Sequence, residues 1–358
     1  MRVVVDARPL VGNRTGIGVH TAEIAGRIAL DPPPLLAAHA PIDDRSGIEH
    51  LALRIDPSLL GLLWQQRILP RVLGEENASV LWGPHGTLPL ASRVPAVVTV
   101  HDLTSITMPH RHELKTVLSF NLLIGPSLAR AAGIAAVSRA TADQVARGFG
   151  VPRNRIEIVP NGVGPEFTPT DESVPRLPRG LEPRRYVLYA GTLEPRKGIG
   201  DLVAAWEELP DRPPLVLCGD PGWGAGALRR RIRRLARGGD LILAGFVPRA
   251  ELAALYRHAL VFVYPSRDEG FGLPPLEAMA SGAPVIAAAG GAIPEVVGEA
   301  AIVVPPGDAS ALRSALVRLL TEPALRAELR ERGIERASLF SWDRSARLMA
   351  ELIARVAR

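Results

Sequence analysis

Short apolar runs alternate with longer amphipathic segments along most of the chain. The runs are rich in Val, Ile and Leu, and the segments between them repeat apolar residues at helical spacing. This alternation predicts parallel β-strands joined by crossover helices. In the first half we expect strands at 2–6, 35–39, 80–82, 96–100, 134–137 and 156–159, with helices near 17–30, 58–74, 113–130 and 140–148.

The second half repeats the pattern after a polar stretch with several prolines, residues 168–185, which predicts a linker. Its expected strands are 186–190, 215–218, 241–244, 261–264, 285–288 and 301–304, and its helices lie near 199–208, 225–237, 249–257, 275–281, 292–297 and 308–320.

The predicted fold class is α/β, with two doubly wound Rossmann-like domains at 1–167 and 186–340. A last helix, 341–358, has no strand after it and is expected to pack back onto the first domain. Parallel sheets of this kind bind ligands beyond the carboxyl ends of their strands, so we expect the site where the two domains face each other across a cleft.

Composition narrows the class of protein without naming a partner. At 358 residues and 47% hydrophobic content the chain is long enough for about two packed domains. Its single cysteine, Cys218, forms no internal disulfide, and no Cys or His spacing predicts a metal site. No signal-peptide pattern and no apolar run of spanning length stand out, so we expect a cytoplasmic protein. The net charge of +5 is too mild to indicate nucleic acid.

Lysine is rare in this chain. Only Lys115 and Lys197 are lysines, and the other 40 of its 42 basic side chains are arginines. A lysine kept in such a background marks a position where a compact ammonium charge suits the chemistry better than a planar guanidinium.

The segment 264–287, YPSRDEGFGLPPLEAMASGAPVIA, carries the clearest chemistry. A predicted strand ends, a glycine-rich loop follows, and two prolines fit the first turn of a helix. Glu269 precedes the loop and Glu277 lies inside the helix, so both carboxylates can accept hydrogen bonds from vicinal hydroxyls such as those of a ribose or a hexose. The loop and helix start offer backbone N–H groups to a phosphate.

Two glutamates around GFGLP, followed by A-x-G-x-P-V-I, resemble the signature of family 4 retaining glycosyltransferases, which have the GT-B fold. The resemblance implies that Glu269 binds the donor sugar and Glu277 the nucleotide ribose. It implies further donor contacts from the loop between them, residues Gly270, Phe271, Gly272 and Leu273. The simpler alternative is a helix start whose glutamates only serve the helix dipole.

GTLEPRKGIG, 191–200, places Arg196 and Lys197 between a strand and a helix, where both can reach a diphosphate. The family has an Arg and a Lys here as diphosphate clamps, the Arg commonly directly after the first glycine. This chain has Thr192 in that place, so Arg196 is the candidate that supplies the guanidinium. Charges at the start of a surface helix are the alternative.

The first half contributes weaker signals. GNRTGIGVH, 12–20, is an incomplete dinucleotide fingerprint, and the resemblance implies backbone contacts from Gly16 and Gly18, while a plain tight turn explains them equally. His101 and Asp102 follow a predicted strand, and the resemblance implies that His101 meets the donor sugar, with Asp102 supporting it or meeting the acceptor. A core histidine is the alternative.

Three other segments need a decision. The resemblance makes Phe246 and Val247 candidates for contact with the nucleobase. The arginine stripe of 227–238 is typical of a solvated helix face, with nucleic acid or acidic lipid as alternatives. Residues 59–74 fit core packing, with peripheral contact at a membrane surface as the alternative.

The sequence therefore predicts a retaining transferase that moves a hexose, mannose by resemblance, from a GDP- or UDP-linked donor to a saccharide or lipid-linked acceptor, without a metal. Arg196, Lys197, Glu269 and His101 are the expected catalytic residues. Two other classes stay open: a two-domain sugar- or nucleotide-binding protein, and a nicotinamide-dependent oxidoreductase, against which the incomplete glycine fingerprint counts.

Overall fold

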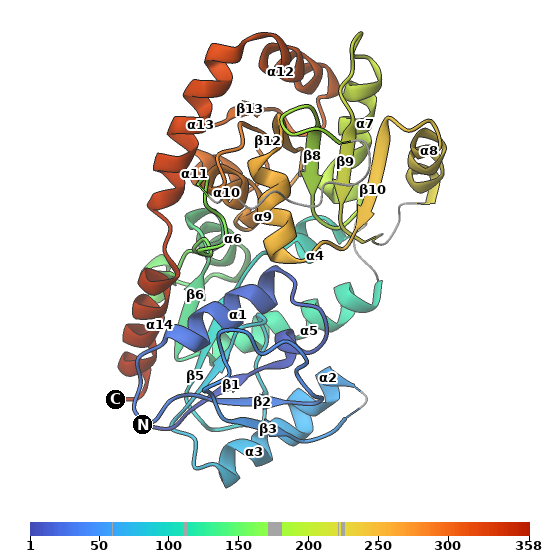
Figure 1. Ribbon diagram of the computed structural model, residues 1–358. Coiled ribbons are helices and arrows are strands. Elements are labelled where there is room, and N and C mark those ends of the chain that lie inside the picture. Colours follow the sequence, from blue (N-terminus) through green and yellow to red (C-terminus); the bar gives the residue numbers. More distant parts are fainter. Residues whose placement is uncertain (59, 110–113, 171–180, 221, 223–225) are drawn as a thin grey trace. The chain divides into compact units, whose positions relative to one another are not determined.

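A computed structural model describes residues 1–58, 60–109, 114–170, 181–220, 222 and 226–358 of the chain. These residues form two compact units (Figure 1). Unit 1 consists of Met1–Gly162 and Ser341–Arg358, and unit 2 consists of Val163–Phe340. The units change at Gly162, before the start of the predicted linker, whose residues 171–180 lie outside the described part of the chain.

Unit 1 has a parallel sheet of seven strands in the order β3-β2-β1-β4-β5-β6-β7. The strands are β1 (Val3–Asp6), β2 (Leu35–Ala38), β3 (Leu53–Ile55), β4 (Val80–Gly83), β5 (Ala96–Val100), β6 (Gly133–Ala136) and β7 (Ile156–Ile158). The helices are α1 (Gly16–Arg27), α2 (Gly61–Leu63), α3 (Leu69–Glu75), α4 (Thr104–Thr107), α5 (Leu114–Arg130), α6 (Arg139–Phe149) and α14 (Trp342–Val356). Chain order reverses between β1 and β4, so their carboxyl ends flank the topological switch point.

The last helix belongs to unit 1 although 178 residues of unit 2 precede it in the chain. α14 packs against α1 and lies over β4, β5 and β6, where Trp342, Met349 and Ile353 are buried. Gly133 on β6 leaves room for this helix, because a Cβ there would lie 2.9 Å from Val356. The helix thus completes the core of unit 1.

Unit 2 has a six-stranded parallel sheet in the order β10-β9-β8-β11-β12-β13. The strands are β8 (Val187–Ala190), β9 (Leu215–Cys218), β10 (Leu241–Gly245), β11 (Val261–Tyr264), β12 (Val285–Ala288) and β13 (Ile302–Val304). The helices are α7 (Ile199–Glu207), α8 (Gly226–Ala236), α9 (Arg249–Arg257), α10 (Leu273–Ala280), α11 (Ile293–Val297), α12 (Ala309–Thr321) and α13 (Pro323–Ser338). The order reverses between β8 and β11, which puts the switch point of this unit at their ends.

Most predicted elements are present, with four differences. Strand β3 was not expected, and neither were α4 and α13. The single helix expected over 58–74 is three pieces, α2, a π-helical segment Trp64–Ile68 and α3. Pro70 accounts for this break, because it has no N–H for an α-helical hydrogen bond, and the N–H of Leu69 instead donates to the carbonyl of Trp64, five residues back.

Two side-chain expectations are also met. Cys218 ends β9 as a free, buried thiol, and burial raises its pKa to about 12. On α8 the arginines at 230, 233 and 234 are exposed, as is Arg237 directly after it, while Ile232 is buried, which is the pattern of a solvated helix on a sheet.

Candidate functional site

The loops that follow β8 and β11 lie side by side at the switch point of unit 2. Gly198 has a left-handed backbone with φ of 68°, and a Cβ on it would lie 2.0 Å from the carbonyl oxygen of Pro265. The N–H of Arg267 donates to the carbonyl of Arg196 at 2.9 Å. These contacts fix the two loops together, so residues 70 positions apart in sequence meet.

Glu269 is the centre of a polar cluster at this point. Its Oε1 accepts hydrogen bonds from the Lys197 ammonium, from the Tyr264 hydroxyl at 2.9 Å and from the Ser266 hydroxyl at 2.5 Å. Lys197 Nζ also donates to Tyr264 Oη at 3.0 Å, and Arg196 Nη1 lies 3.6 Å from Glu269 Oε1. The structure therefore brings together three predicted catalytic residues and adds Tyr264 and Ser266, which the sequence analysis missed.

The charges in this cluster are set by mutual pairing. Burial raises the pKa of Glu269, but Lys197 and Arg196 outweigh it and bring that pKa down to about 2. Burial and Arg196 lower the pKa of Lys197, while the contact with Glu269 opposes them. Because the ammonium has three N–H groups and contacts Glu269 and Tyr264, it keeps one donor for a ligand oxygen.

The glycine-rich loop ends in a constrained turn. Gly272 precedes α10 with φ of 110°, and a Cβ there would lie 2.5 Å from Ile293. Gly270 is buried, Leu273 is half-buried, and the Phe271 ring packs edge-on against another ring of unit 2. Pro274 and Pro275 have no N–H, and the N–H of Leu276 donates to the carbonyl of Gly272 at 3.4 Å, so an anion at this end of α10 would meet the N–H of Leu273.

Glu277 projects from the next turn of α10 into a second polar cluster. Its Oε1 lies 3.1 Å from Arg249 Nη1, and Arg249 Nε lies 2.7 Å from Glu166 Oε1. Burial raises the pKa of Glu277 to about 7, and Glu166 adds to the rise, while Arg249 opposes it. Sequence reasoning missed Arg249 and Glu166, although Arg249 lies only two residues beyond Val247, a predicted base contact.

The remaining donor candidates of unit 2 lie on the loops around these clusters. Thr192 is exposed, and its carbonyl accepts a hydrogen bond from Tyr189 at 3.1 Å. Phe246 is 54% exposed and Val247 is half-buried after β10. An exposed aromatic ring beside buried charges fits contact with a planar ligand group.

In unit 1 a pocket of about 530 Å³ opens at the switch point between β1 and β4. Polar side chains from the ends of four strands line it, together with apolar helical residues, Ile17, Leu62 and Phe120 among them. They include Arg8, His39, His85, Thr87, His101, Asp102, Ile17 and Phe120. The pocket volume is in the range of small-molecule sites.

His101 is held in one tautomer. Its Nε2 lies 2.9 Å from the carbonyl oxygen of Pro84, which can only accept, so Nε2 carries the proton and Nδ1 the lone pair. The buried His20 ring meets it edge to face at 4.6 Å, and Trp342 of α14 lies 6.1 Å from His20. Burial and the neighbouring His20 lower the pKa of His101, so the ring is neutral at neutral pH.

Asp102 and the two glycines have local structural roles. Asp102 Oδ1 accepts hydrogen bonds from the N–H and the hydroxyl of Thr104, at 2.9 and 2.7 Å. The carboxylate therefore bonds the first residue of α4 and not the His101 ring. Gly16 is the exposed first residue of α1. Gly18 is buried, and a Cβ on it would lie 2.6 Å from the carbonyl of Pro9, which explains a glycine there without a ligand.

Comparison with known proteins decides the family. The model for "Glycosyl transferases group 1" matches residues 178–336, and that for "Glycosyltransferase Family 4" matches residues 16–167. The O-antigen chain mannosyltransferase B of Escherichia coli is 32% identical over 369 residues, covering 96% of this chain and 97% of the relative. This chain is a group 1 glycosyltransferase. As such it uses a nucleotide-sugar donor.

Two further similarities describe its fold and its relatives. The group 1 chain matches the crystal structure of Anabaena HepE, in complex with UDP and glucose, with a TM-score of 0.81 at 21% identity and 99% coverage of both chains. The serotype-specific mannosyltransferase WbdA of Escherichia coli is 33% identical over 63% of this chain, which spans 29% of that longer relative. The glycosyltransferase therefore has the GT-B fold expected from its sequence. Among its described residues, no helix is both long and apolar enough to cross a bilayer.

Proposed function

We propose that this glycosyltransferase moves a mannosyl group from a nucleoside diphosphate donor to a saccharide hydroxyl, with retention of the anomeric configuration. The name of the relative that is 32% identical over nearly the whole chain supports mannose as the sugar and a growing polysaccharide as the acceptor. The observation that carries the proposal is the buried cluster in which Lys197 and Glu269 meet at the switch point of unit 2. An ammonium and a carboxylate held there serve a leaving diphosphate and a sugar.

In this proposal unit 2 binds the donor. Glu277 accepts hydrogen bonds from the ribose hydroxyls, and Phe246 and Val247 contact the base, which is guanine or uracil. The N–H groups of the glycine-rich loop and of Leu273 at the start of α10 bind phosphate oxygens. Thr192 contributes a backbone contact to the same ligand.

The reaction begins when an acceptor hydroxyl approaches the anomeric carbon on the face from which the diphosphate leaves. The new carbon–oxygen bond forms as the bond to the diphosphate oxygen breaks, and that oxygen takes the hydroxyl proton. Lys197 and Arg196 stabilise the negative charge that develops on the diphosphate. The Glu269 carboxylate orients the sugar hydroxyls. These residues supply the positive charge, so we expect turnover to survive a chelator.

Unit 1 supplies the acceptor pocket and a neutral imidazole. His101 meets the donor sugar and orients it, and Asp102 lies at the acceptor side of the same pocket. A neutral ring accepts a hydroxyl hydrogen bond at Nδ1 because Nε2 is already committed to Pro84.

The first test is a thermal-shift panel with GDP, UDP, GDP-mannose, UDP-glucose and NAD, without added metal. A ligand at about 100 times its Kd adds about 2.7 kcal/mol to the folded state, which shifts the midpoint by a few degrees. We expect one nucleoside diphosphate and its sugar to give this shift. Glu277→Ala should abolish it, and Glu251→Ala, which changes an exposed glutamate on α9, should not. A shift with NAD alone would contradict the proposal.

Turnover separates transfer from mere binding. Incubation with the preferred donor and a mannose oligosaccharide should release the nucleoside diphosphate and lengthen the oligosaccharide, which mass spectrometry detects. Retention is read from the one-bond C1–H1 coupling of the new linkage, compared with that of the donor. Tight donor binding without release, in the presence of a competent acceptor, would instead identify a binding protein.

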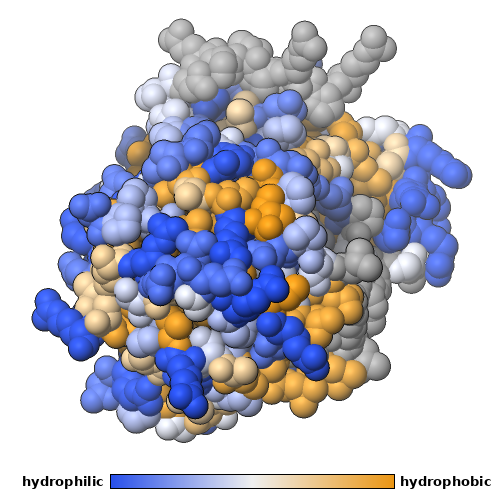
Figure 2. Space-filling view, turned by 90° about the horizontal axis from the view of Figure 1, so that it is seen from below, coloured by the Kyte–Doolittle hydropathy of each residue, from blue (hydrophilic) through white to orange (hydrophobic). Residues whose placement is uncertain are grey.

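A lipid-linked acceptor and a peripheral membrane contact belong to the same proposal. In the segment expected to lie in the core or on a membrane, Trp64 and Leu69 are buried, but Leu60 and Leu63 are 55% and 50% exposed. Figure 2 shows one face of the chain on which apolar side chains gather in patches between hydrophilic ones. Co-sedimentation with anionic vesicles, compared between the wild type and Leu60→Ser/Leu63→Ser, tests the contact.

A further inference from the structure

The pocket of unit 1 contains one guanidinium, and that guanidinium is already neutralised. Among the described residues that line the pocket, Arg8 is the only Arg or Lys. Its Nη2 lies 2.7 Å from Asp6 Oδ2 and its Nε lies 2.9 Å from Asp6 Oδ1, a two-pronged pair. The Asp6 side chain is 1% exposed and the Arg8 side chain 11%. A ligand at this wall therefore meets an ion pair with no net charge.

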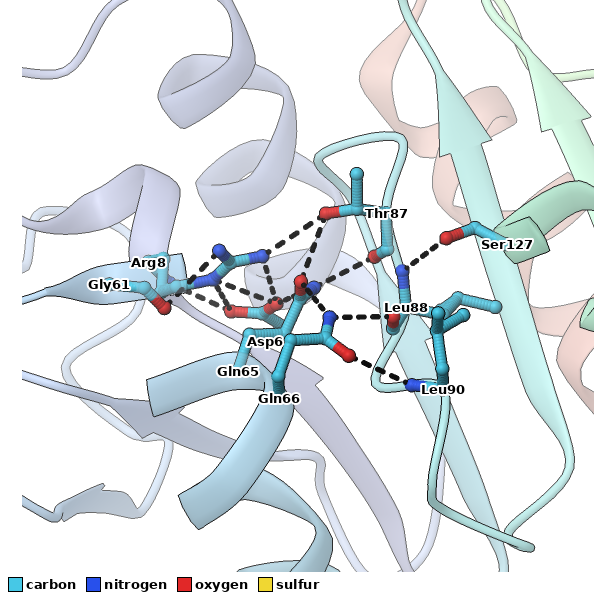
Figure 3. A network of polar contacts seen from close by, with 9 residues as sticks. All are labelled: Asp6, Arg8, Gly61, Gln65, Gln66, Thr87, Leu88, Leu90 and Ser127. Atoms are coloured by element: carbon cyan, nitrogen blue, oxygen red, sulfur yellow. Dashed lines mark hydrogen bonds and ion pairs between the residues drawn. The ribbon is translucent and has the colours of Figure 1, made fainter. Parts of the chain in front are cut away.

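A buried glutamine fixes the pair. Gln65 Nε2 donates to Asp6 Oδ2 at 3.0 Å and to the carbonyl of Thr87 at 2.9 Å, and Gln65 Oε1 accepts from the Thr87 hydroxyl at 3.1 Å. Arg8 Nη1 also reaches the carbonyl of Gly61 at 3.4 Å. Figure 3 shows these contacts converging on the Asp6 carboxylate. Arg8 thus cannot turn toward an anion without leaving Asp6 buried and unpaired, which is costly.

Two neighbouring glutamines of the π-helical segment, Gln65 and Gln66, form hydrogen bonds with the same loop. Gln66 Nε2 donates to the carbonyl of Leu88 at 3.0 Å, and its Oε1 accepts from the N–H of Leu90 at 3.1 Å. Both glutamines therefore hold the loop after β4 (Figure 3). The same loop carries Pro84, whose carbonyl accepts a hydrogen bond from His101. By holding this loop, the two glutamines also position the His101 ring. The polar wall of the pocket is formed before any ligand binds.

The other described residues that line the pocket add no Arg or Lys, and its three histidines are neutral at neutral pH. Phe120 lies against Gly86, where a Cβ would be 2.8 Å from its ring, and gives a flat apolar surface. Burial and the Arg8 charge lower the pKa of His39, and burial lowers that of His101, so both rings are neutral at neutral pH. Asp102 is the acid on the rim. Among the described residues that line this pocket, an anion meets the acid Asp102 and no Arg or Lys outside an ion pair.

We propose that this pocket recognises an uncharged sugar residue of the acceptor, and that the Asp6–Arg8 pair excludes a phosphorylated one. The inference rests on the proposed function and deepens it by naming the acceptor class. The hydroxyls of a neutral sugar can donate to the acceptor oxygens of Thr87 and Asp102, and the apolar face of a pyranose matches Phe120. Arg8 acts as a positioning residue and not as an anion receptor.

The test compares mannobiose with mannobiose that carries a 6-phosphate on its non-reducing sugar, using the wild-type full chain. Binding is followed by the ring signals of the eight histidines, of which His39, His85 and His101 line the pocket, while His258 lies in unit 2 as an internal reference. We expect the neutral sugar to move the pocket signals and the phosphorylated sugar to bind at least ten-fold more weakly. Equal or tighter binding of the phosphorylated sugar would overturn the proposal.

Asp6→Asn provides a gain-of-function arm, because it releases the Arg8 charge with little change in shape. It should shift the preference toward the phosphorylated sugar by at least ten-fold, and Asp43→Asn, an exposed position in the same unit, should not. An unchanged preference in a folded Asp6→Asn variant would contradict the proposed role of the pair. If Asp6→Asn does not fold, the wild-type comparison decides alone.

The outcomes also separate this inference from the proposed function. The histidine signals report on sugar binding without a donor, whereas the nucleotide panel reports on unit 2. If the protein binds and turns over its donor but prefers the phosphorylated acceptor, only the proposed selectivity of the unit 1 pocket is contradicted. A chain that binds no nucleotide sinks the proposed function, whatever the pocket binds.

Discussion

Arg249 lies between two carboxylates, 2.7 Å from Glu166 and 3.1 Å from Glu277. A single guanidinium therefore serves two acids, and the more buried of the two, Glu277, has its pKa raised to about 7 by that burial. This acid is also the one we assign to the ribose. A ligand with two hydroxyls would add further donors to those that Arg249 gives this carboxylate in the free protein.

The first prediction concerns stability and pH. Glu277 has an ordinary pKa of 4.5 and a folded-state pKa of about 7, so the unfolded chain releases this proton first as pH rises. The contribution of Glu277 to stability is therefore full below pH 4.5 and is lost as pH rises to 7, by on the order of 3 kcal/mol. Glu277→Gln should remove that decline in urea unfolding of unit 2, while Glu251→Gln keeps it. An unchanged pH slope in Glu277→Gln would contradict the assigned pKa.

The second prediction concerns the Lys197 ammonium. Lys197→Met should lower turnover by about 10²- to 10³-fold, the usual effect of losing one group that stabilises developing charge. Breaking the buried pair also destabilises the fold by up to about 3–5 kcal/mol, although Tyr264 and Ser266 still donate to Glu269. Lys197→Arg should restore stability better than turnover, since a planar fork does not fit a compact site. Single-turnover rates and thermal melts on the same preparations separate the two effects.

The third prediction concerns acid. Burial lowers the pKa of His20 from 6.5 to about 4, although its hydrogen bond with Asn161 raises it, so the unfolded chain takes up this proton first as pH falls. The stability that the neutral ring contributes is present above pH 6.5 and is lost toward pH 4, on the order of 3 kcal/mol. His20→Gln should flatten this acid loss in unit 1, whereas His50→Gln at an exposed position should leave it. If His20→Gln and the wild type lost the same free energy of unfolding in acid, the lowered pKa of His20 would be contradicted.

The fourth prediction uses two neighbouring glycines. Gly198→Ala places a Cβ 2.0 Å from the Pro265 carbonyl in a left-handed backbone, so it should destabilise unit 2 by more than about 2 kcal/mol and weaken donor binding. Gly200, inside α7, has nothing within 4 Å of an added Cβ. Gly200→Ala should therefore stabilise by about 0.5–1 kcal/mol. Chemical denaturation of both variants checks the contrast, and equal effects would refute the proposed contact between the two loops.

The sequence predicted the parts of the site that depend on chain order. Apolar runs identified β8 and β11, and the rule that ligands bind beyond strand ends placed Lys197 and Glu269 in one region before their contact was known. The resemblance added roles for them. Thr192, where the family commonly has an arginine, left the guanidinium uncertain, and the structure brings Arg196 within 3.6 Å of Glu269.

Other parts depend on packing and had no sequence signal. Arg249 reaches Glu277 because α9 and α10 pack together, and no spacing along the chain encodes that contact. Asp6 and Arg8 are two residues apart at a strand end, an arrangement common in loops. The hydrogen bond from Gln65 to Asp6 holds this pair in place at the wall of the pocket. The proline at position 70 is the one local hint of the π-helical segment, since it removes an N–H where a continuous helix needs one.

The chain leaves unit 1 and later returns to it, so this unit can be expressed alone only from a gene with an internal deletion. Gly162 lies against Ser341 and Trp342, with a Cβ on it 2.2 Å from the Trp342 nitrogen, and the next residue, Val163, donates to the carbonyl of Phe340 at 3.3 Å. The point where the chain leaves unit 1 and the point where it returns are thus adjacent. Deleting 163–340 and joining 162 to 341 through a short glycine link leaves every strand of the first sheet and its last helix on one polypeptide. A gene truncated after 162, in contrast, would leave the surface normally covered by α14 open to water.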